Sequence, residues 1–460
     1  MTKRNSLSVK KVSVLLSMVL IMALLAACGA NDKANNGGNG NSSNDSSNGG
    51  SNGAVGSEEQ VEIRFSWWGS QGRHDRTLKA IELFEQKYPN IKIKPEYSSW
   101  DGYWEKLSTQ VAAGNAPDIM QMSILYIKEY SERDVLGDMN PYAGTELGIA
   151  DLNADVLANQ GTINGKLTGI PVADNASVLL VNKEIFNQAG VELPAVDSTW
   201  EELLIKSREL KGAVGNNVYG VFDASSSLEA FMYYLFSKGD TLYADNRLGY
   251  WDENLKNWLE MWEAARTEGI VPPANITAAA LPLSNADPNK DALLKGQVAI
   301  MGPTWIGSFP AYETVMTENV DMISYPHAEQ TGSVLQTAMF LSTSAKSKHP
   351  KEAALFIDFM VNSLEAADVL ETERGLPENK KVREYLEPKF TERDKKMITM
   401  LEHVSQSQPA WYDAGPKGAG EVTSLFEQVL QKHQFGKATA DEVVAEFRTE
   451  GDKIFAKNNN

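Results

Sequence analysis

Val61-Glu62-Ile63-Arg64-Phe65-Ser66-Trp67-Trp68-Gly69 is the stretch of sequence that decides the fold. Apolar and polar residues alternate through its first six positions, and this period of two predicts a strand. Ligands of open α/β sheets bind at the carboxyl ends of strands, so the two indoles stand where they can form a flat apolar surface. Core packing is the alternative for each Trp. Because neighbours on a strand face opposite ways, we expect one indole to line a cleft and the other to anchor the strand end.

The residues that follow alternate between helical and strand patterns. They predict a helix at 76–87, a strand at 91–94, a helix at 104–113 and a strand at 119–122. This order implies parallel pairing and a βαβ architecture, and therefore the α/β class.

Later segments continue the pattern. Strands are predicted at 178–181, 297–301 and 338–341, and helices at 182–188, 200–211, 421–431 and 441–456. Thr199 or its neighbour Ser198 can cap the helix at 200–211, with Glu201 or Glu202 completing a capping box. The spacing of Leu255, Trp258, Leu259 and Trp262 predicts a core stripe rather than a binding surface.

The first 57 residues read as an export and anchoring segment. A basic head precedes an apolar run at 12–27, which is typical of a secretory signal peptide at 1–27. Leu25-Ala26-Ala27-Cys28-Gly29 resembles the bacterial lipobox, in which the Cys carries lipid. Cys28 is the only cysteine in the chain, so no intrachain disulfide is possible. Residues 28–57 are rich in Asn, Gly and Ser and predict a disordered tether, which leaves the protein lipid-anchored at the outer face of a bacterial cell membrane.

Composition and motifs exclude several functions. A net charge of -18 and a pI near 4.9 argue against binding nucleic acid. The chain lacks a Walker loop, a Gly-x-Ser-x-Gly motif and a His-Glu-x-x-His motif, and its five His residues never stand at ligand spacing. We therefore expect no catalytic site, no metal and no cofactor. One alternative stays open, a secreted carbohydrate-active enzyme that uses Asp174 and Asp223 as paired carboxylates.

Several stretches resemble the extracellular solute-binding proteins of ABC sugar importers, the family that includes the maltose-binding type. The matching segments run in the family's order from residue 58 onward. They are Trp67-Trp68-Gly69 with the helix after it, Gly114-Asn115-Ala116-Pro117-Asp118-Ile119, Asn164 to Pro171, Val181-Asn182-Lys183-Glu184, Thr199-Trp200-Glu201-Glu202 and Gly296 to Trp305.

The resemblance implies a two-lobed, periplasmic-binding-protein-like fold of type II, with the ligand in a cleft between lobes that are joined by hinge segments. One lobe would comprise residues 58–174 and 334–365, and the other 175–333 and 366–460. The protein would be a monomer that captures a carbohydrate, expected to be an oligosaccharide, and delivers it to the permease subunits of an ABC transporter.

Candidate ligand-binding residues follow from the chemistry of a sugar. Aromatic rings stack on the C–H face of a pyranose, while carboxylates, amides and Arg bond its hydroxyls. The aromatic candidates are Trp67, Trp68, Trp100, Tyr103, Trp305 and Trp411, of which Trp100 and Tyr103 are expected in a loop, Trp305 after a Gly-Pro turn and Trp411 in a Pro/Gly-bounded loop. By resemblance, Trp305 lies where the family often stacks a sugar, and Asp174 with Asn175 lies at the first hinge.

The remaining candidates are polar. Arg374 precedes Gly375-Leu376-Pro377, which resembles the last hinge. Many relatives carry an acidic sugar ligand after the third strand, whereas here Ser123 follows Met122, so Ser123 and Tyr126 are the candidates at that point. Arg73 and Asp223 are the last two candidates. Arg73, His74 and Arg374 also favour another alternative for the whole protein, a receptor for a peptide or an anion.

Overall fold

The computed structural model describes residues 60–215, 218–280 and 291–458. The predicted signal peptide (1–27), the lipidation site Cys28 and the tether (28–57) lie outside these residues. The strand predicted from the opening stretch is confirmed as β1 (Val61–Trp68).

A sheet built around β1 confirms the predicted βαβ pairing. β1 pairs in parallel with β2 (Ile91–Ser98) and with β3 (Ile119–Met122). The crossover helices are α2 (Gln71–Lys87) and α3 (Trp100–Ala112). β12 (Val334–Thr343) pairs antiparallel with β3 and extends this sheet toward β6 (Ile170–Asn182).

Alternation along β1 divides its side chains between two hydrophobic cores. Phe65 and Trp67 pack on the side of α2, α12 (Pro350–Asn362) and α13 (Leu364–Leu370). Trp68 packs on the other side, with residues of α3 and α4 (Ile124–Glu132). The predicted opposite facing of Trp67 and Trp68 is therefore confirmed.

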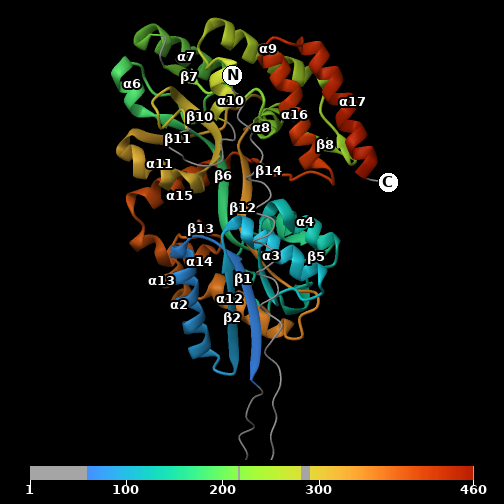
Figure 1. Ribbon diagram of the computed structural model, residues 1–460. Helices are drawn as coiled ribbons and strands as arrows, with labels where there is room; N and C mark the ends of the chain where they lie inside the picture. Colours follow the sequence, from blue (N-terminus) through green and yellow to red (C-terminus); the bar gives the residue numbers. More distant parts are fainter. Residues whose placement is uncertain (1–59, 216–217, 281–290, 459–460) are drawn as a thin grey trace, which may run out of the picture. The chain divides into compact units, whose positions relative to one another are not determined.

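β6 is the strand that joins this sheet to a second one. Its residues 170–176 pair with β12, while 177–182 pair with β10 (Val298–Trp305) and β11 (Val320–Ser324). β13 (Leu376–Pro377) pairs with Ala173 and Asp174 near the middle of β6. Figure 1 shows β6 and β12 side by side where the chain crosses between the sheets.

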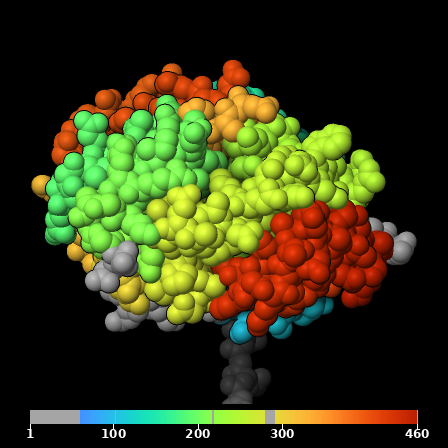
Figure 2. Space-filling model, turned by 90° about the horizontal axis from the view of Figure 1, so that it is seen from above, coloured from blue at the N-terminus to red at the C-terminus, as the bar shows by residue number. Residues whose placement is uncertain are grey.

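The second sheet also has a core on each face. Leu179 and Val181 of β6 pack with helices α6 to α9, α16 and α17, whereas Val178 and Leu180 pack with α11 and α15. The bounds of these helices are α6 (Lys183–Ala189), α7 (Trp200–Val214), α8 (Leu228–Ser237), α9 (Asp252–Glu268), α11 (Phe309–Met316), α15 (Glu392–Gln406), α16 (Ala419–Gln434) and α17 (Ala440–Asn458). In Figure 2 the C-terminal helices (red) lie against the yellow-green segment that carries α8 and α9.

Smaller elements complete the described chain. They are α5 (Ala154–Val156), β4 (Thr162–Ile163), β5 (Lys166–Leu167), β7 (Tyr219–Val221), β8 (Tyr243–Ala244), β9 (Arg247–Leu248), α10 (Ala274–Ala280), α14 (Lys380–Leu386) and β14 (Ala410–Trp411). Short 3-10 helices lie at 140–142 (η1), 306–308 (η3), 317–319 (η4) and 387–389 (η5), and a π-helix lies at 157–161 (η2). No helix in these described parts is long and apolar enough to cross a membrane.

The predicted helix signals at α7 and α9 are confirmed. Thr199 accepts from the backbone N–H of Glu202, whose side chain accepts in return from that of Thr199. The predicted stripe at 255–262 is fully buried in α9.

Three local predictions are wrong. Trp100 and Tyr103 lie in α3 rather than in a loop, because α3 begins at Trp100, and Tyr103, Leu107 and Val111 repeat at helical spacing on its buried face. Trp305 ends a strand rather than following a turn, since a register shift between Met301 and Thr304 lets β10 continue past Gly302-Pro303. Trp411 lies in β14, which pairs with the start of β12.

Candidate ligand-binding site

A cavity of about 500 Å³ lies where the crossing segments meet. Asp174 and Asn175 of β6, together with Met339 of β12, contribute from two crossing strands. Arg73 contributes from the first turn of α2, and the 372–376 segment from the third crossing. The second sheet adds Trp305 with the 306–308 turn, and α15 adds Arg393, Asp394 and Met397. The lining of the cavity therefore comes from both sheets and from the helices that pack on them.

Trp305 is the aromatic residue of the cavity wall. It is partly exposed, and its ring lies edge-on to Tyr412 at 5.8 Å and to Tyr233 at 6.3 Å between centroids. Asn175 supports the turn that follows, because its Oδ1 accepts from the backbone N–H of Gly307 at 3.1 Å. The indole is thus fixed by neighbours while part of its surface stays open for a ligand.

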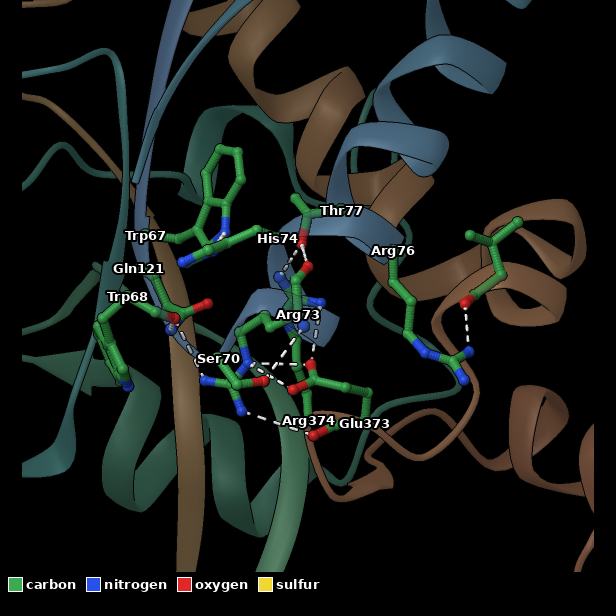
Figure 3. A network of polar contacts seen from close by, with 11 residues as sticks. Trp67, Trp68, Ser70, Arg73, His74, Arg76, Thr77, Gln121, Glu373 and Arg374 are labelled. Carbon is green, nitrogen blue, oxygen red and sulfur yellow. Dashed lines mark hydrogen bonds and ion pairs between the residues drawn. The ribbon is translucent and has the colours of Figure 1, made fainter. Parts of the chain in front are cut away.

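Arg73 and Glu373 join the start of α2 to the third crossing segment (Figure 3). Arg73 Nε donates to both carboxylate oxygens of Glu373, at 3.1 and 2.9 Å. Its Nη1 donates to the carbonyl oxygen of Trp68, which also accepts from Gln121 Nε2. The guanidinium therefore links β1, α2 and the 372–375 segment.

Arg374 lies next to this pair and is almost fully buried, with 6 % of its surface exposed. Its Nη2 donates to Thr77 Oγ1 at 2.6 Å. Burial and the nearby positive charge of Arg73 lower the pKa of Arg374 to about 9, so it remains a cation at neutral pH.

Asp174 takes part in a second polar group at the crossing. Arg383 Nη1 donates to its Oδ2 at 2.8 Å. Glu378, which is 1 % exposed, accepts from the backbone N–H of Asn153. Burial, and then the neighbouring carboxylate of Asp174, raise the pKa of Glu378, so that this carboxyl keeps its proton at neutral pH.

The structure brings five of the thirteen predicted ligand residues to this cavity. They are Arg73, Asp174, Asn175, Trp305 and Arg374. The other eight do not line it, namely Trp67, Trp68, Trp100, Tyr103, Ser123, Tyr126, Asp223 and Trp411.

Neither indole of the opening stretch lies on the cavity wall. Trp67 is fully buried, and its Nε1 donates to His74 Nδ1 at 3.1 Å. This bond occupies the imidazole acceptor, and burial, together with the charge of Arg73, lowers the pKa of His74. Trp68 is 8 % exposed, and its ring packs against Trp100 and Tyr103.

The predicted residues of α3 and α4 belong to that same aromatic cluster. Tyr103 is buried and donates to the carbonyl oxygen of Gln121 at 2.6 Å. Tyr126 packs on Trp104, with 4.2 Å between ring centroids. Ser123 caps α4 by accepting from the backbone N–H of Leu125. Trp100 keeps 38 % of its surface exposed outside the cavity.

Asp223 is held in a buried ion pair. Its Oδ2 accepts from Arg266 Nη1 at 2.7 Å and from Gln434 Nε2 at 3.1 Å, and its Oδ1 accepts from the backbone N–H of Ser225. These bonds use both carboxylate oxygens for structure. Asp174 and Asp223 therefore do not meet as a carboxylate pair in the cavity.

Several cavity residues had no signal in the sequence. Arg393 and Asp394 lie on an amphipathic helix where charges normally mark a solvated face, and the hydrophobic pattern of α15 does not show which charges turn inward. The only indication in the sequence that Glu373 belongs to the site is its position directly before the predicted ligand residue Arg374. Across the described parts of the chain, no three His, Cys, Asp or Glu side chains are grouped so as to hold a metal ion.

The fold and the cavity define the class. Two sheets with helices on both faces are joined by crossing strands, and the cavity lies where these strands cross. This arrangement is the two-lobed periplasmic-binding fold of solute receptors. A family model described as bacterial extracellular solute-binding protein matches residues 79–399. The chain belongs to this family.

Known relatives agree with the assignment. The multiple sugar-binding protein of Streptococcus mutans is 24 % identical over 342 residues, which cover 67 % of this chain and 73 % of that protein. Among solved structures, an extracellular solute-binding protein family 1 member from Alicyclobacillus acidocaldarius is 28 % identical, with a TM-score of 0.72, covering 87 % of this chain and all of that one. A periplasmic oligogalacturonide-binding protein from Yersinia enterocolitica, in complex with saturated digalacturonic acid, is 27 % identical with the same TM-score and the same coverage of both chains.

Proposed function

We propose that this protein is the receptor of an ABC importer and captures a carbohydrate, in the form of an oligosaccharide, outside the cell. The observation that carries the proposal is the composition of the cavity. One partly exposed indole, Trp305, shares its wall with the amide of Asn175, the carboxylate of Asp174 and the guanidinium groups of Arg73 and Arg374. A sugar needs both kinds of partner, an aromatic face and hydrogen-bonding side chains.

The names of the relatives support a carbohydrate. The Streptococcus mutans protein is a multiple sugar-binding protein, and the Yersinia structure holds an oligogalacturonide. A volume of about 500 Å³ falls in the usual range for small-molecule sites. These points favour a sugar over the peptide alternative.

Ligand capture would work through closure of the lobes, with 58–174 and 334–365 as one lobe and 175–333 and 366–460 as the other. A ligand that contacts Arg73 on the first lobe and Trp305 on the second binds the closed form more tightly than the open form, so it shifts the population toward closure. The permease subunits would then recognise the closed form. Ala366 and Leu370 pack in the core of the first sheet. This packing favours a first lobe that extends past residue 365.

We also propose that the receptor is a monomer held to the outer face of the cell membrane by lipid on Cys28. The motif Leu25-Ala26-Ala27-Cys28-Gly29 and the tether after it support this location. Cys28→Ala should release the protein from the membrane fraction and abolish incorporation of labelled palmitate in cells. Retention of the label in this variant would contradict the anchor.

A ligand titration tests the main proposal. The full chain is titrated with single oligosaccharides by calorimetry, and each mixture is then analysed by chromatography. Saturable binding with unchanged sugar is the expected result. Shorter products would instead favour the enzyme alternative, and binding of peptides alone would overturn the carbohydrate.

A further inference from the structure

Arg374 carries more hydrogen-bonding capacity than its surroundings use. Of its three nitrogens, only Nη2 has an acceptor, Thr77 Oγ1, while Nε and Nη1 have no hydrogen-bond partner. The nearest carboxylate oxygen, Glu373 Oε2, lies 3.8 Å from Nη1, which is too long for a hydrogen bond. Buried N–H groups without an acceptor lower the stability of the folded state, so a ligand that supplies an acceptor to Arg374 would gain binding free energy.

The charges around Arg374 leave it without a carboxylate of its own. Glu373 already accepts two hydrogen bonds from Arg73, so one carboxylate serves two guanidinium groups. The other charged residues of the cavity have hydrogen-bond partners elsewhere. Asp174 pairs with Arg383, Arg393 pairs with Glu313, and Asp394 accepts from the backbone N–H of Thr391 and the hydroxyl of Thr372. Among Arg73, Arg374 and Glu373, two guanidinium groups share one carboxylate, which leaves one positive charge in excess within this group.

Two spaces lie next to Arg374. It lines the 500 Å³ cavity, and it also borders a void of about 30 Å³, which has room for one water but not for a sugar. An acceptor that carries a negative charge would satisfy both the free N–H groups and the charge. A carboxylate does this with charge-assisted hydrogen bonds, which are stronger than bonds from a neutral hydroxyl.

We propose that the ligand is an acidic sugar, whose carboxylate accepts hydrogen bonds from Arg374 while one of its rings stacks on Trp305. This inference rests on the proposed function and names the substrate class of that same site. A free anion would leave Trp305 without a partner, and a neutral sugar would leave the charge of Arg374 unmatched. A uronic acid residue within an oligosaccharide uses both groups at once.

Calorimetry with matched ligands tests the inference without any variant. The full chain is titrated with oligomers of galacturonic, glucuronic and mannuronic acid, with the methyl ester of each, and with the corresponding neutral hexose oligomers. Acetate and inorganic phosphate are added as free anions. We expect the tightest ligand to be an acidic oligomer, and its methyl ester to bind at least tenfold more weakly. A neutral oligomer or an ester that binds as tightly as the acid would overturn the inference and leave the proposed function standing.

Variants then assign the effect to Arg374. Arg374→Gln should weaken binding of the acidic oligomer at least tenfold and bring it to the level of the ester, and Arg374→Lys should fall between the two. Arg76→Gln is the matched control, because Arg76 pairs with Glu371 on the same segment but does not line the cavity. Unchanged affinity of a folded Arg374 variant would overturn the assignment. Failure of every sugar to bind the wild-type chain would overturn the proposed function, and binding of phosphate or acetate as tight as that of the acidic oligomers would replace the sugar by a free anion.

Discussion

Arg73 and Glu373 are 300 positions apart in the chain, yet Arg73 Nε donates to both carboxylate oxygens of Glu373 (Figure 3). Their side chains are 14 % and 18 % exposed, so the pair is largely shielded from water. Arg73 begins the helix after β1, and Glu373 lies in the third segment that crosses between the sheets. The pair therefore fixes the position of Arg374, the neighbour of Glu373, relative to the cavity.

Glu373→Gln should lower the free energy of unfolding by about 1–3 kcal/mol, because charged hydrogen bonds of this kind contribute that much and two guanidinium groups lose their carboxylate. Urea unfolding of this variant, of Arg73→Met and of the double variant measures the coupling energy. The exposed pair Lys94–Glu62, 3.6 Å apart, is the control and should couple by less than about 1 kcal/mol. Equal coupling in both pairs would show that Arg73–Glu373 has no special role.

Trp305→Ala should weaken sugar binding by about 1–3 kcal/mol, because the variant loses the only indole of the cavity wall in the described chain. Trp251→Ala, which removes an indole that is 76 % exposed and outside the cavity, should leave affinity unchanged. Trp67→Ala should instead lower stability by about 3–5 kcal/mol, because Trp67 is fully buried. Calorimetry and urea unfolding separate the two effects, and an unchanged affinity of Trp305→Ala would remove it from the site.

Asp223→Ala should lower the free energy of unfolding by about 3–5 kcal/mol, because it leaves the guanidinium of Arg266 without its buried partner. Sugar affinity of the folded variant should not change, since Asp223 does not line the cavity. Asp413→Ala, at an exposed position, is the control and should change stability by less than about 1 kcal/mol. An enzyme that used Asp223 would show the opposite pattern, with normal stability and lost turnover.

Periodic segments of the fold could be predicted from the sequence, whereas the crossing segments could be placed only by resemblance and their strand structure could not be predicted. The alternation in β1 and the capping box at Thr199 are local signals, and both agree with the structure. The apolar pattern predicts only 178–181 of β6, because the first half of this strand includes polar residues, Asp174 and Asn175, which the pattern of a buried strand does not contain. Their place in a strand depends on pairing with β12, whose residues lie about 160 positions later.

The candidate site was predictable only where chemistry and chain position coincide. Trp305, Asp174 and Arg374 line the cavity and each stands beside a Gly, Pro or hinge-like stretch in the sequence. Trp68 and Tyr103 do not line it, because an aromatic residue at a strand end looks the same in sequence whether a helix covers it or a ligand does. That difference is decided by tertiary packing of α3 and α4.

Glu96 should make the stability of the first sheet depend on acid pH. Burial alone would raise the pKa of Glu96, but hydrogen bonds from Arg64, Lys106 and Gln110 lower it to about 2. A folded pKa below the unfolded value means that the stabilisation is present above about pH 4.5 and is lost as pH falls toward 2. Glu96→Gln should remove on the order of 3 kcal/mol of this dependence in urea unfolding between pH 5 and pH 2. If the free energy of unfolding of Glu96→Gln depended on pH as steeply as that of wild type, the lowered pKa of Glu96 would be contradicted.

Glu378→Gln should be tolerated and should become relatively more stable as pH rises. Burial and the neighbouring carboxylate of Asp174 raise the pKa of Glu378, so the folded state holds a proton that the unfolded state releases above about pH 4.5. The stabilisation of wild type is therefore complete below the unfolded pKa and is lost as pH rises toward the folded pKa, by about 1.4 kcal/mol per pH unit. The amide of Gln is neutral at every pH and therefore does not titrate. In urea unfolding at pH 5, 6.5 and 8, the stability of the variant relative to wild type should thus increase at each step. Glu82→Gln, at an exposed position of α2, is the control and should show no such increase. A stability difference that does not change with pH would mean that Glu378 is ionised in the folded protein.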